Sequence, residues 1–289
     1  MIAVLLVGGE GTRLRPLTEW LPKSMLPIVN RPFLEHQLEH LRSHGVDDVI
    51  LSCGYLPEPI TEHFCDTLRY AVEPEPLGTG GAIRFSAEGI DETFLVCNGD
   101  VLTDLDIGAL LRTHREQGAA ATIALHRVVN PSAYGLVRTE ADGRVTAFIE
   151  KPSPGEMDVD TINAGTYVLE PGVLELIEPG RAVSVERDVF PRLIGGGLYA
   201  RADDGRWRDI GTPASYLAAN LERMPPGGLV DTSAQVDESA DVAESVVGPR
   251  ARVGASARIH RSVVLPDAEV AGGATFEHAV VGRDGRAVW

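Results

Sequence analysis

The chain has 289 residues, a formal net charge of −16 at pH 7 and a hydrophobic content of 44%. That length allows one large domain or two, and the hydrophobic content suffices for a buried core. The excess of negative charge would repel a phosphate backbone, so we expect no nucleic-acid partner. No run of about eighteen apolar residues and no basic amino-terminal leader occurs in the sequence. We therefore expect no membrane span and a cytoplasmic location.

The cysteines also indicate a cytoplasmic protein. Cys53, Cys65 and Cys97 are scattered along the chain. This number and spacing indicate neither a disulfide framework nor a metal site. We expect all three to be reduced residues of the core.

The first chemically informative segment lies near the amino terminus. Residues 2–7 are apolar and predict a buried strand. Three glycines follow it: Gly8, Gly9 and Gly11. They let the backbone turn sharply, and the amides of such a turn form a concave anion site. Three basic residues add positive charge nearby: Arg13, Arg15 and Lys23. The segment therefore predicts a phosphate-binding loop, which is neither a dinucleotide fingerprint nor a Walker motif.

The first two-thirds of the chain alternate apolar runs with amphipathic stretches, which predicts an α/β domain with a mainly parallel sheet. Strands are expected at 2–7, 48–53, 68–72, 94–98 and 120–126. Helices are expected at 33–44, 79–87, 106–117, 184–194 and 213–222. Turn signals between extended segments at 134–170, including a strand at 145–150, predict an antiparallel excursion beside the sheet.

The carboxyl-terminal part has a different character. Residues 225–228, Pro-Pro-Gly-Gly, predict a linker. Beyond it, aliphatic residues recur every six positions with one slip: Val230, Val236, Val242, Val247, Val253 and Ile259. This period is typical of a parallel β-helix. We expect a catalytic domain at 1–224 and a short β-helix at 229–289 that promotes a homo-oligomer.

Eight short motifs carry a family resemblance: Gly8–Leu17, Pro22–Pro27, Glu73–Ala82, Asn98–Asp100, Tyr134–Gly135, Glu150–Pro152, Asn163–Gly165 and Trp207–Thr212. With them the chain resembles the sugar nucleotidyltransferases, which join a nucleoside triphosphate to a sugar 1-phosphate and release pyrophosphate. Segments 75–82 and 184–191 resemble bacterial guanylyltransferases of the mannose-1-phosphate type. The resemblance implies a Rossmann-like domain, with a mixed, mainly parallel sheet flanked by helices, followed by a left-handed parallel β-helix.

The resemblance also implies roles for single residues. The nucleotide would be held at Gly8, Gly9, Gly11, Thr12, Glu73, Gly78 and Gly80. Arg13 would neutralise the leaving pyrophosphate, and Lys23 would contact the side of the α-phosphate. Asp100 and Asp209 would hold Mg²⁺, since two hard carboxylates suit that ion. Taken alone, an aspartate after glycine is by default an Asx-turn or helix-cap residue, and only its pairing with Asp209 indicates a metal site.

For the sugar phosphate, the resemblance implies that Lys151 grips the phosphate while Glu150 and Asn163 read the sugar hydroxyls. The backbones at Gly135 and Gly165 would let the ring approach closely. Without the motif, Lys151 is an ordinary surface lysine and Asn163 a solvated strand-edge residue.

The choice of base and acceptor is less constrained. A carboxylate at Glu73 or Glu75 favours guanine, which offers two donors on one edge where thymine and uracil offer one. We therefore expect GTP, and the resemblance to the guanylyltransferases implies mannose 1-phosphate or a close relative as the acceptor. Thymidylyl, uridylyl or adenylyl transfer to glucose 1-phosphate, a heptose phosphate or a cyclitol phosphate stays open.

Two residues depart from the family pattern. Glu10 puts negative charge into the phosphate loop and should weaken triphosphate binding unless it faces solvent. Ser24 stands where the family usually has proline, which makes the Lys23 segment less rigid. Two other classes of function also stay open: a catalytically silent sugar-nucleotide-binding subunit, and a β-helix acyltransferase using His260 or His278.

Overall fold

The computed structural model describes residues 1–288. The chain forms two compact units, and each is assembled from separate stretches of sequence. Unit 1 consists of residues 1–9 and 37–207, and unit 2 of residues 10–36 together with the chain from Arg208 onward. The expected boundary between 1–224 and 229–289 stays a prediction.

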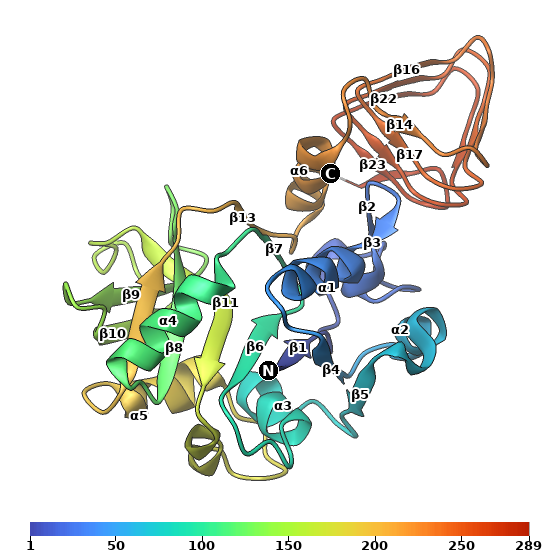
Figure 1. Ribbon diagram of the computed structural model, residues 1–289. Helices are drawn as coiled ribbons and strands as arrows, with labels where there is room; N and C mark the ends of the chain where they lie inside the picture. The colour runs from blue at the N-terminus through green and yellow to red at the C-terminus, as the bar shows by residue number, and fades with distance from the viewer. Residues whose placement is uncertain (289) are drawn as a thin grey trace. The chain divides into compact units, whose positions relative to one another are not determined.

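Unit 1 is built on a nine-stranded mixed sheet with the order β10-β9-β11-β6-β1-β4-β5, in which β8 pairs with β11 and β12 pairs with β8 (Figure 1). Its strands are β1 Ile2–Leu6, β4 Asp48–Cys53, β5 Arg69–Val72, β6 Phe94–Asn98, β8 Ala121–Arg127, β9 Gly135–Thr139, β10 Val145–Glu150, β11 Thr161–Leu169 and β12 Leu198–Ala202. The run β6-β1-β4-β5 is parallel, and β9, β10 and β11 pair antiparallel. The five predicted strands, the excursion and the α/β class are confirmed.

The helices are α1 Phe33–Ser43, α2 Glu58–Phe64, α3 Gly78–Ser86, α4 Ile107–Gln117, α5 Phe190–Leu193 and α6 Pro213–Arg223. Leu34, Leu38 and Leu41 are buried along one face of α1, as their spacing predicts. Asp106 caps α4 by accepting a hydrogen bond from the amide of Ala109 at 2.8 Å. No helix within residues 1–288 is long and apolar enough to cross a bilayer.

The helix expected at 184–194 is the main departure. It is a π-helical turn, η5 Val185–Val189, followed by the short α5. Pro191 has no amide hydrogen to donate, and the amide of Phe190 reaches back five residues to the carbonyl of Val185. A proline inside the apolar period therefore changes the helix type.

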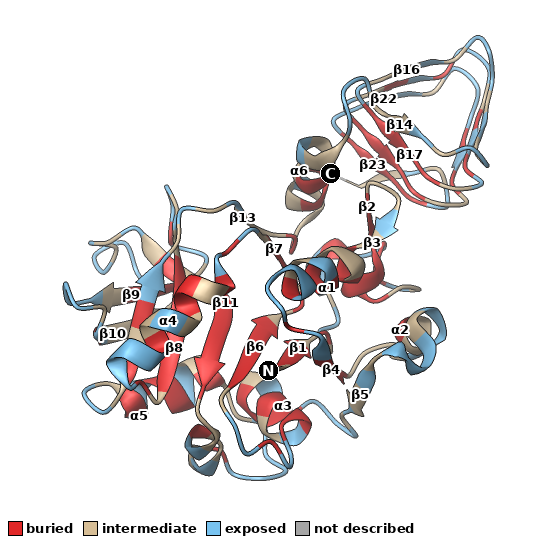
Figure 2. Ribbon diagram, in the orientation of Figure 1, coloured by how far each residue is buried: buried red, intermediate tan, exposed pale blue. Residues whose placement is uncertain are grey.

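The core of unit 1 lies along the central strands, which are buried on both faces (Figure 2). Cys53 and Cys97 belong to it, and burial raises the pKa of each thiol to about 12. Both thiols therefore stay protonated at neutral pH. The expectation is wrong for Cys65, which is exposed because it follows α2, a helix that the sequence pattern did not reveal.

The carboxyl-terminal part of unit 2 is a parallel β-helix, as predicted, and it has three faces. Its strands are β14 Leu229–Val230, β15 Gln235–Val236, β16 Asp241–Ala243, β17 Val246–Val247, β18 Arg252–Val253, β19 Arg258–His260, β20 Val263–Val264, β21 Glu269–Val270, β22 Thr275–Glu277, β23 Val280–Val281 and β24 Ala287–Val288. The faces are β14-β17-β20-β23, β15-β18-β21 and β16-β19-β22. On the first face, β24 returns antiparallel to β23.

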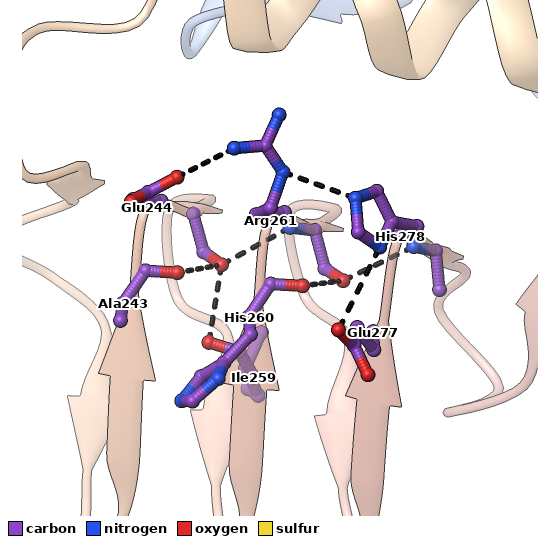
Figure 3. Close-up of polar contacts among 10 residues, drawn as sticks. Ala243, Glu244, Ile259, His260, Arg261, Glu277 and His278 are labelled. Atoms are coloured by element: carbon purple, nitrogen blue, oxygen red, sulfur yellow. Dashed lines mark hydrogen bonds and ion pairs between the residues drawn. The ribbon is translucent and has the colours of Figure 1, made fainter.

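One corner of each coil explains the slip in the sequence period. Equivalent positions lie 17 residues apart, one fewer than three hexapeptides. The shortened corner carries three stacked residues with left-handed backbone: Glu244, Arg261 and His278. Beneath them, the hydroxyl of Ser245 accepts the amide of Ser262 at 3.1 Å, which satisfies a donor at the tight turn. Arg261 joins the other two side chains, donating to Glu244 at 2.8 Å and to His278 at 3.0 Å (Figure 3).

Candidate active site

The glycine turn starts at the end of β1 in unit 1. A Cβ at Gly8 would lie 2.9 Å from the amide nitrogen of Gly54, so glycine is needed for the chain to pass there. Gly9 is exposed, and a Cβ built on it would meet nothing within 4 Å. Beside β1, the amide of Gly99 donates to the carbonyl of Leu6 at 2.8 Å. Asp100, half-buried, follows directly, at the carboxyl edge of parallel strands where α/β proteins bind ligands.

The second part of the turn belongs to unit 2. Gly11 has a φ of +61°, and a Cβ there would lie 3.0 Å from Thr18 Cγ2 and 3.3 Å from Lys23 Cβ. The Thr18 hydroxyl donates to the Gly11 carbonyl at 2.9 Å. The short helix η1 Thr12–Leu14 then begins, which places Thr12 and Arg13 directly after the turn. Glycine is thus required at position 11 because the backbone is left-handed there and because Thr18 and Lys23 leave no room for a side chain.

Three predicted catalytic residues come together in unit 2. Lys23, in the short helix η2 Lys23–Met25, places Nζ 3.7 Å from Asp209 Oδ1. Arg13 places Nη2 3.9 Å from Asp209 Oδ2. The Lys23 side chain is 11% exposed and that of Arg13 is 65% exposed. Two cations therefore flank one carboxylate at ion-pair distance: the Lys23 side chain is mostly buried, and the Arg13 side chain faces solvent.

Gly211 makes this cluster possible. A Cβ at Gly211 would lie 2.5 Å from Arg13 Nη2 and 2.9 Å from both oxygens of Asp209. Directly after it, Thr212 caps α6 through a capping box with Ser215, and Pro213 begins the helix. The motif at 207–212 thus contains the carboxylate of Asp209, the glycine that leaves room for it, and the N-cap of α6.

The metal site stays a prediction, because Asp100 belongs to unit 1 and Asp209 to unit 2. Within residues 1–288, no group of three or more His, Cys, Asp or Glu side chains is placed to hold a metal ion. The predicted donor set, two carboxylates, has the oxygen chemistry that Mg²⁺ prefers.

Glu73, predicted to read the base, is half-buried and is oriented by its own chain. Its Oε1 accepts from Ser52 Oγ at 3.3 Å, and its Oε2 accepts the amide of Leu77 at 3.0 Å. A carboxylate has about four acceptor positions, so these two bonds leave capacity for a ligand. Glu75, the alternative, is exposed. Of the two, Glu73 is the one whose orientation is defined.

The glycines at the start of α3 have a packing role that the sequence did not suggest. A Cβ at Gly78, whose φ is +67°, would lie 2.7 Å from the carbonyl oxygen of Val183. The amide of Gly80 donates to that same carbonyl at 2.8 Å. Thr79 donates to Glu186 at 2.6 Å. These glycines bring α3 against residues 181–186, and their contact with a nucleotide stays a prediction.

The predicted sugar-binding residues form two adjacent pairs in unit 1. A Cβ at Gly135 would lie 2.9 Å from Glu150 Oε2, so the missing side chain leaves room for that carboxylate. Asn163 donates to the Tyr167 hydroxyl at 2.8 Å and accepts the amide of Gly165 at 2.9 Å. Lys151 is exposed and has a φ of +55°, a sparsely populated backbone for a non-glycine residue.

Electrostatics distinguish Glu150 from a surface carboxylate. Burial raises its pKa, and the negative charge of Glu186 raises it further, while Arg187 and Lys151 oppose both effects. Sequence reasoning did not single out Glu186 as a site residue. It is oriented by hydrogen bonds from Thr79 at 2.6 Å and Ser184 at 2.7 Å. Its only sequence signal was its place within the motif at 184–191.

The two departures from the family pattern have local explanations. Glu10 is exposed and pairs with Arg15 at 3.2 Å, so it faces solvent and its charge is neutralised. Ser24 is buried within η2, and its hydroxyl has no hydrogen-bond partner among the described residues. Glu10 therefore gives no structural reason to doubt the loop.

Comparison with known proteins now decides the family. A profile described as nucleotidyl transferase matches residues 2–224, and a profile described as GlmU-like, C-terminal hexapeptide matches residues 228–287. The chain belongs to the nucleotidyl transferase family. The predicted family and the left-handed parallel β-helix of hexapeptide-repeat proteins are thereby confirmed.

Named relatives are similar over most of the chain. A mannose-1-phosphate guanylyltransferase of Mycobacterium tuberculosis is 44% identical over 230 residues, which cover 76% of this chain and 64% of that protein. Mannose-1-phosphate guanylyltransferase 1 of Arabidopsis thaliana is 37% identical, with 86% of this chain and 75% of that protein covered. The chain thus spans about two-thirds to three-quarters of the length of these relatives.

Solved structures agree with the fold. The crystal structure of HddC from Yersinia pseudotuberculosis complexed with GMP-PN matches with a TM-score of 0.67 and 31% identity, and covers 76% of this chain and 98% of that one. A putative glucose-1-phosphate thymidylyltransferase from Bacillus anthracis has a TM-score of 0.70 at 22% identity, with 77% of this chain and 95% of that one covered. The second likeness supports the fold alone.

Proposed function

We propose that this protein transfers the nucleoside monophosphate of GTP to mannose 1-phosphate or a close relative, giving a nucleoside-diphosphate sugar and pyrophosphate. The observation that carries the proposal is the cluster of Arg13, Lys23 and Asp209 beside the Gly11 turn. Two cations beside a backbone anion site suit a triphosphate. The names of the relatives, and the guanine nucleotide in the HddC structure, support the choice of GTP.

The reaction needs charge neutralisation more than proton transfer. A phosphate oxygen of the sugar phosphate forms a bond to the α-phosphorus, and the bond from that phosphorus to the oxygen bridging the β-phosphate breaks. The electron pair leaves with pyrophosphate, and no proton has to move. Lys23, little exposed, is suited to the α-phosphate, where negative charge is shared in the transition state. The solvent-facing Arg13 is suited to the departing pyrophosphate.

Nucleotidyltransferases of this family generally use a divalent metal. We propose Mg²⁺ as that metal and Asp100 and Asp209 as its protein ligands, with substrate phosphates and water completing the coordination. When bound, the ion adds positive charge at the phosphates. Asp209 would then link the ion to Lys23 and Arg13, which its carboxylate already approaches.

The sugar phosphate would bind on unit 1, where Glu150 and Asn163 offer acceptors and a donor for hydroxyls and Lys151 offers a charge for the phosphate. The guanine base would be read by Glu73. Its carboxylate can accept the N1–H and the exocyclic amine together, while a base with a single donor would leave part of that capacity unused.

Alternative bases and acceptors remain candidates for the same site. One relative, a UTP–glucose-1-phosphate uridylyltransferase of Synechocystis, is 37% identical over 241 residues. A silent regulatory subunit is less well supported, because the five charged residues expected for catalysis are all present: Arg13, Lys23, Asp100, Lys151 and Asp209. A homo-oligomer and a cytoplasmic location are part of the same proposal.

The decisive experiment measures pyrophosphate release with five triphosphates against a panel of sugar and cyclitol phosphates in Mg²⁺. We expect the highest kcat/KM with GTP and mannose 1-phosphate, and no turnover by Asp100→Asn or Asp209→Asn. A higher kcat/KM with UTP and glucose 1-phosphate would replace the substrate assignment. No turnover with any pair would overturn the enzymatic assignment.

A further inference from the structure

The segment that carries Arg13 and Lys23 belongs to the same compact unit as the β-helix, far along the chain. This segment, residues 10–36, is in contact with the β-helix on both sides of Lys23. On one side the contact is made by Trp20, and on the other by Asn30. The predicted phosphate-binding residues are therefore tied to a part of the protein with no expected role in the chemistry.

In the first contact, the guanidinium group of Arg283 stacks on the ring of Trp20. The guanidinium carbon of Arg283 lies 3.5 Å from the centroid of the Trp20 ring, within the range of a cation–π interaction. Arg283 follows β23, and its Nη2 lies 3.4 Å from Asp267 Oδ2. Asp267 is itself held by Arg250 at 2.6 and 2.8 Å. The adjacent coil thus orients the guanidinium that covers Trp20.

Apolar contact continues this interface toward the glycine turn. Leu17 is buried, and its Cδ2 would lie 3.9 Å from a Cβ built on Gly282. The next residue, Thr18, is buried and donates to the carbonyl of Gly11. Leu17 therefore lies near the last turn of the β-helix, and the residue after it holds the turn that precedes Arg13.

The second contact lies beyond Lys23. Strands β2 Pro27–Ile28 and β3 Arg31–Pro32 form a hairpin whose turn residues, Val29 and Asn30, have φ values of 50° and 62°. The side-chain amide of Asn30 donates from Nδ2 to the carbonyl of Val247 in β17 at 3.0 Å. The hairpin is held from α6 as well, because the amide of Val29 donates to Asn220 at 2.8 Å. Lys23 thus lies between two anchored points.

We infer that the end of the β-helix positions the phosphate-binding segment, and that Arg283 is a positioning residue for nucleoside triphosphate binding. This inference rests on the proposed function for its kinetic consequence. A segment held in place before the ligand arrives loses less conformational freedom on binding. Removing the stacked cation should therefore weaken triphosphate binding, with little effect on the chemical step once the nucleotide is bound.

The test compares Arg283→Ala with Arg286→Ala in the full chain. Arg286 lies in the same final turn of the chain and is 86% exposed, and its guanidinium approaches Asp284 at 3.8 Å, so it is a matched loss of charge. We expect Arg283→Ala to raise the KM for the triphosphate roughly fivefold, in keeping with the usual strength of such a contact. The KM for the sugar phosphate and kcat should change less than about twofold. Arg286→Ala should match the wild type.

Substitutions of Trp20 test the partner. Trp20→Phe keeps an aromatic face and should retain most of the affinity, whereas Trp20→Ala should resemble Arg283→Ala. The double variant should be no worse than either single variant, because both remove one interaction. Additive losses, or a Trp20→Phe as weak as Trp20→Ala, would contradict the stacked contact.

Hydrogen exchange of residues 12–22 separates this inference from the proposed function. Even without turnover, Arg283→Ala should speed exchange in that peptide relative to Arg286→Ala. If Arg283→Ala does not fold, Asn30→Gly serves instead, because glycine keeps the left-handed turn and loses only the bond to Val247. Exchange and triphosphate KM equal to those of the control would overturn the inference.

Discussion

Two glycine-rich stretches of this chain look alike in sequence and differ in what their glycines approach. At 8–11, Gly9 faces open space and Gly11 adopts a left-handed backbone beside Thr18 and Lys23. At 78–81, each glycine lies against the backbone of residues 181–185, and the amides of Gly80 and Gly81 both donate to Val183. The first stretch thus has one glycine, Gly9, with open space beside it, whereas all three glycines of the second lie against another segment of the protein.

The difference shows that a glycine allows another group to approach the backbone closely, but does not show whether that group is a ligand or another part of the protein. In the first stretch, the neighbouring charges of Arg13 and Lys23 indicate an anionic ligand. In the second, the approaching group is the protein's own carbonyl, Thr79 donates to Glu186, and contact with a nucleotide stays a prediction. The following predictions test this contrast.

The largest effect is expected at Lys23. Lys23→Met keeps the length of the buried stem and removes its charge, so kcat/KM should fall about 10²- to 10³-fold while the melting temperature stays near that of the wild type. Arg15→Met is the matched control, because Arg15 is exposed in the same loop and pairs with Glu10. Its kcat/KM should change less than about threefold. Equal losses in both variants would show that the loop needs only bulk positive charge.

Next comes the stability of the second stretch. A Cβ at Gly81 would lie 2.6 Å from the carbonyl oxygen of Arg181 and 2.8 Å from Leu77 Cβ. Gly81→Ala should therefore lower the free energy of unfolding by about 1–3 kcal/mol, measured by urea denaturation. Turnover per folded molecule should stay close to wild type. An unchanged midpoint would mean that residues 181–185 can move away from α3.

Gly9 should behave in the opposite way. Its Cβ would enter open space, so Gly9→Ala should leave the urea midpoint unchanged. If the triphosphate approaches this backbone, the new methyl group should raise the KM for the triphosphate about tenfold. A KM equal to that of the wild type would remove Gly9 from the nucleotide site.

The smallest effect concerns pH. An ionised Glu150 accepts hydrogen bonds from sugar hydroxyls, and protonation removes that capacity. Because burial and Glu186 raise its pKa, the KM for the sugar phosphate should begin to rise at a higher pH than for an ordinary glutamate as the solution is acidified. The rise should be a few-fold, seen in pH profiles of KM.

The weaker binding of the sugar phosphate at low pH would not come from unfolding caused by Glu150. A carboxyl group whose pKa is raised in the folded state binds its proton more tightly when folded, so this group stabilises the fold as pH falls. Glu150→Gln should flatten the acid limb of the KM profile. Glu156→Gln, at an exposed carboxyl whose pKa is lowered by hydrogen bonds from Ser153, should leave the limb unchanged.

The sequence patterns predicted the secondary structure that depends on neighbouring residues. The apolar periods predicted five strands of the sheet, the helix α1 and the β-helix, because each depends on which side chains alternate or repeat. The strand β12 Leu198–Ala202 was not predicted. The short helix α2 was missed, since Pro57 and Pro59 look like turn residues although Pro57 precedes the first turn of a helix. Motif order indicated Arg13, Lys23 and Asp209, which the structure brings together.

Other contacts between distant segments could not be predicted. Nothing near Gly78 in the sequence indicates that Val183 will lie against it, and nothing near Trp20 points to Arg283. Glu186 is similar, since its neighbours Thr79 and Ser184 become relevant only after the chain has folded. Such pairs depend on tertiary packing, which a single sequence does not display.

The reversed strand β24 has a consequence for assembly. A solenoid of parallel coils can in principle accept another coil at its end, from its own chain or from a neighbouring molecule. Here β24 occupies the hydrogen-bonding edge of β23 in the opposite direction. Along that face, the strand that follows the last parallel coil therefore runs against the direction of the coils, so a further parallel coil cannot pair directly with β23 at that edge.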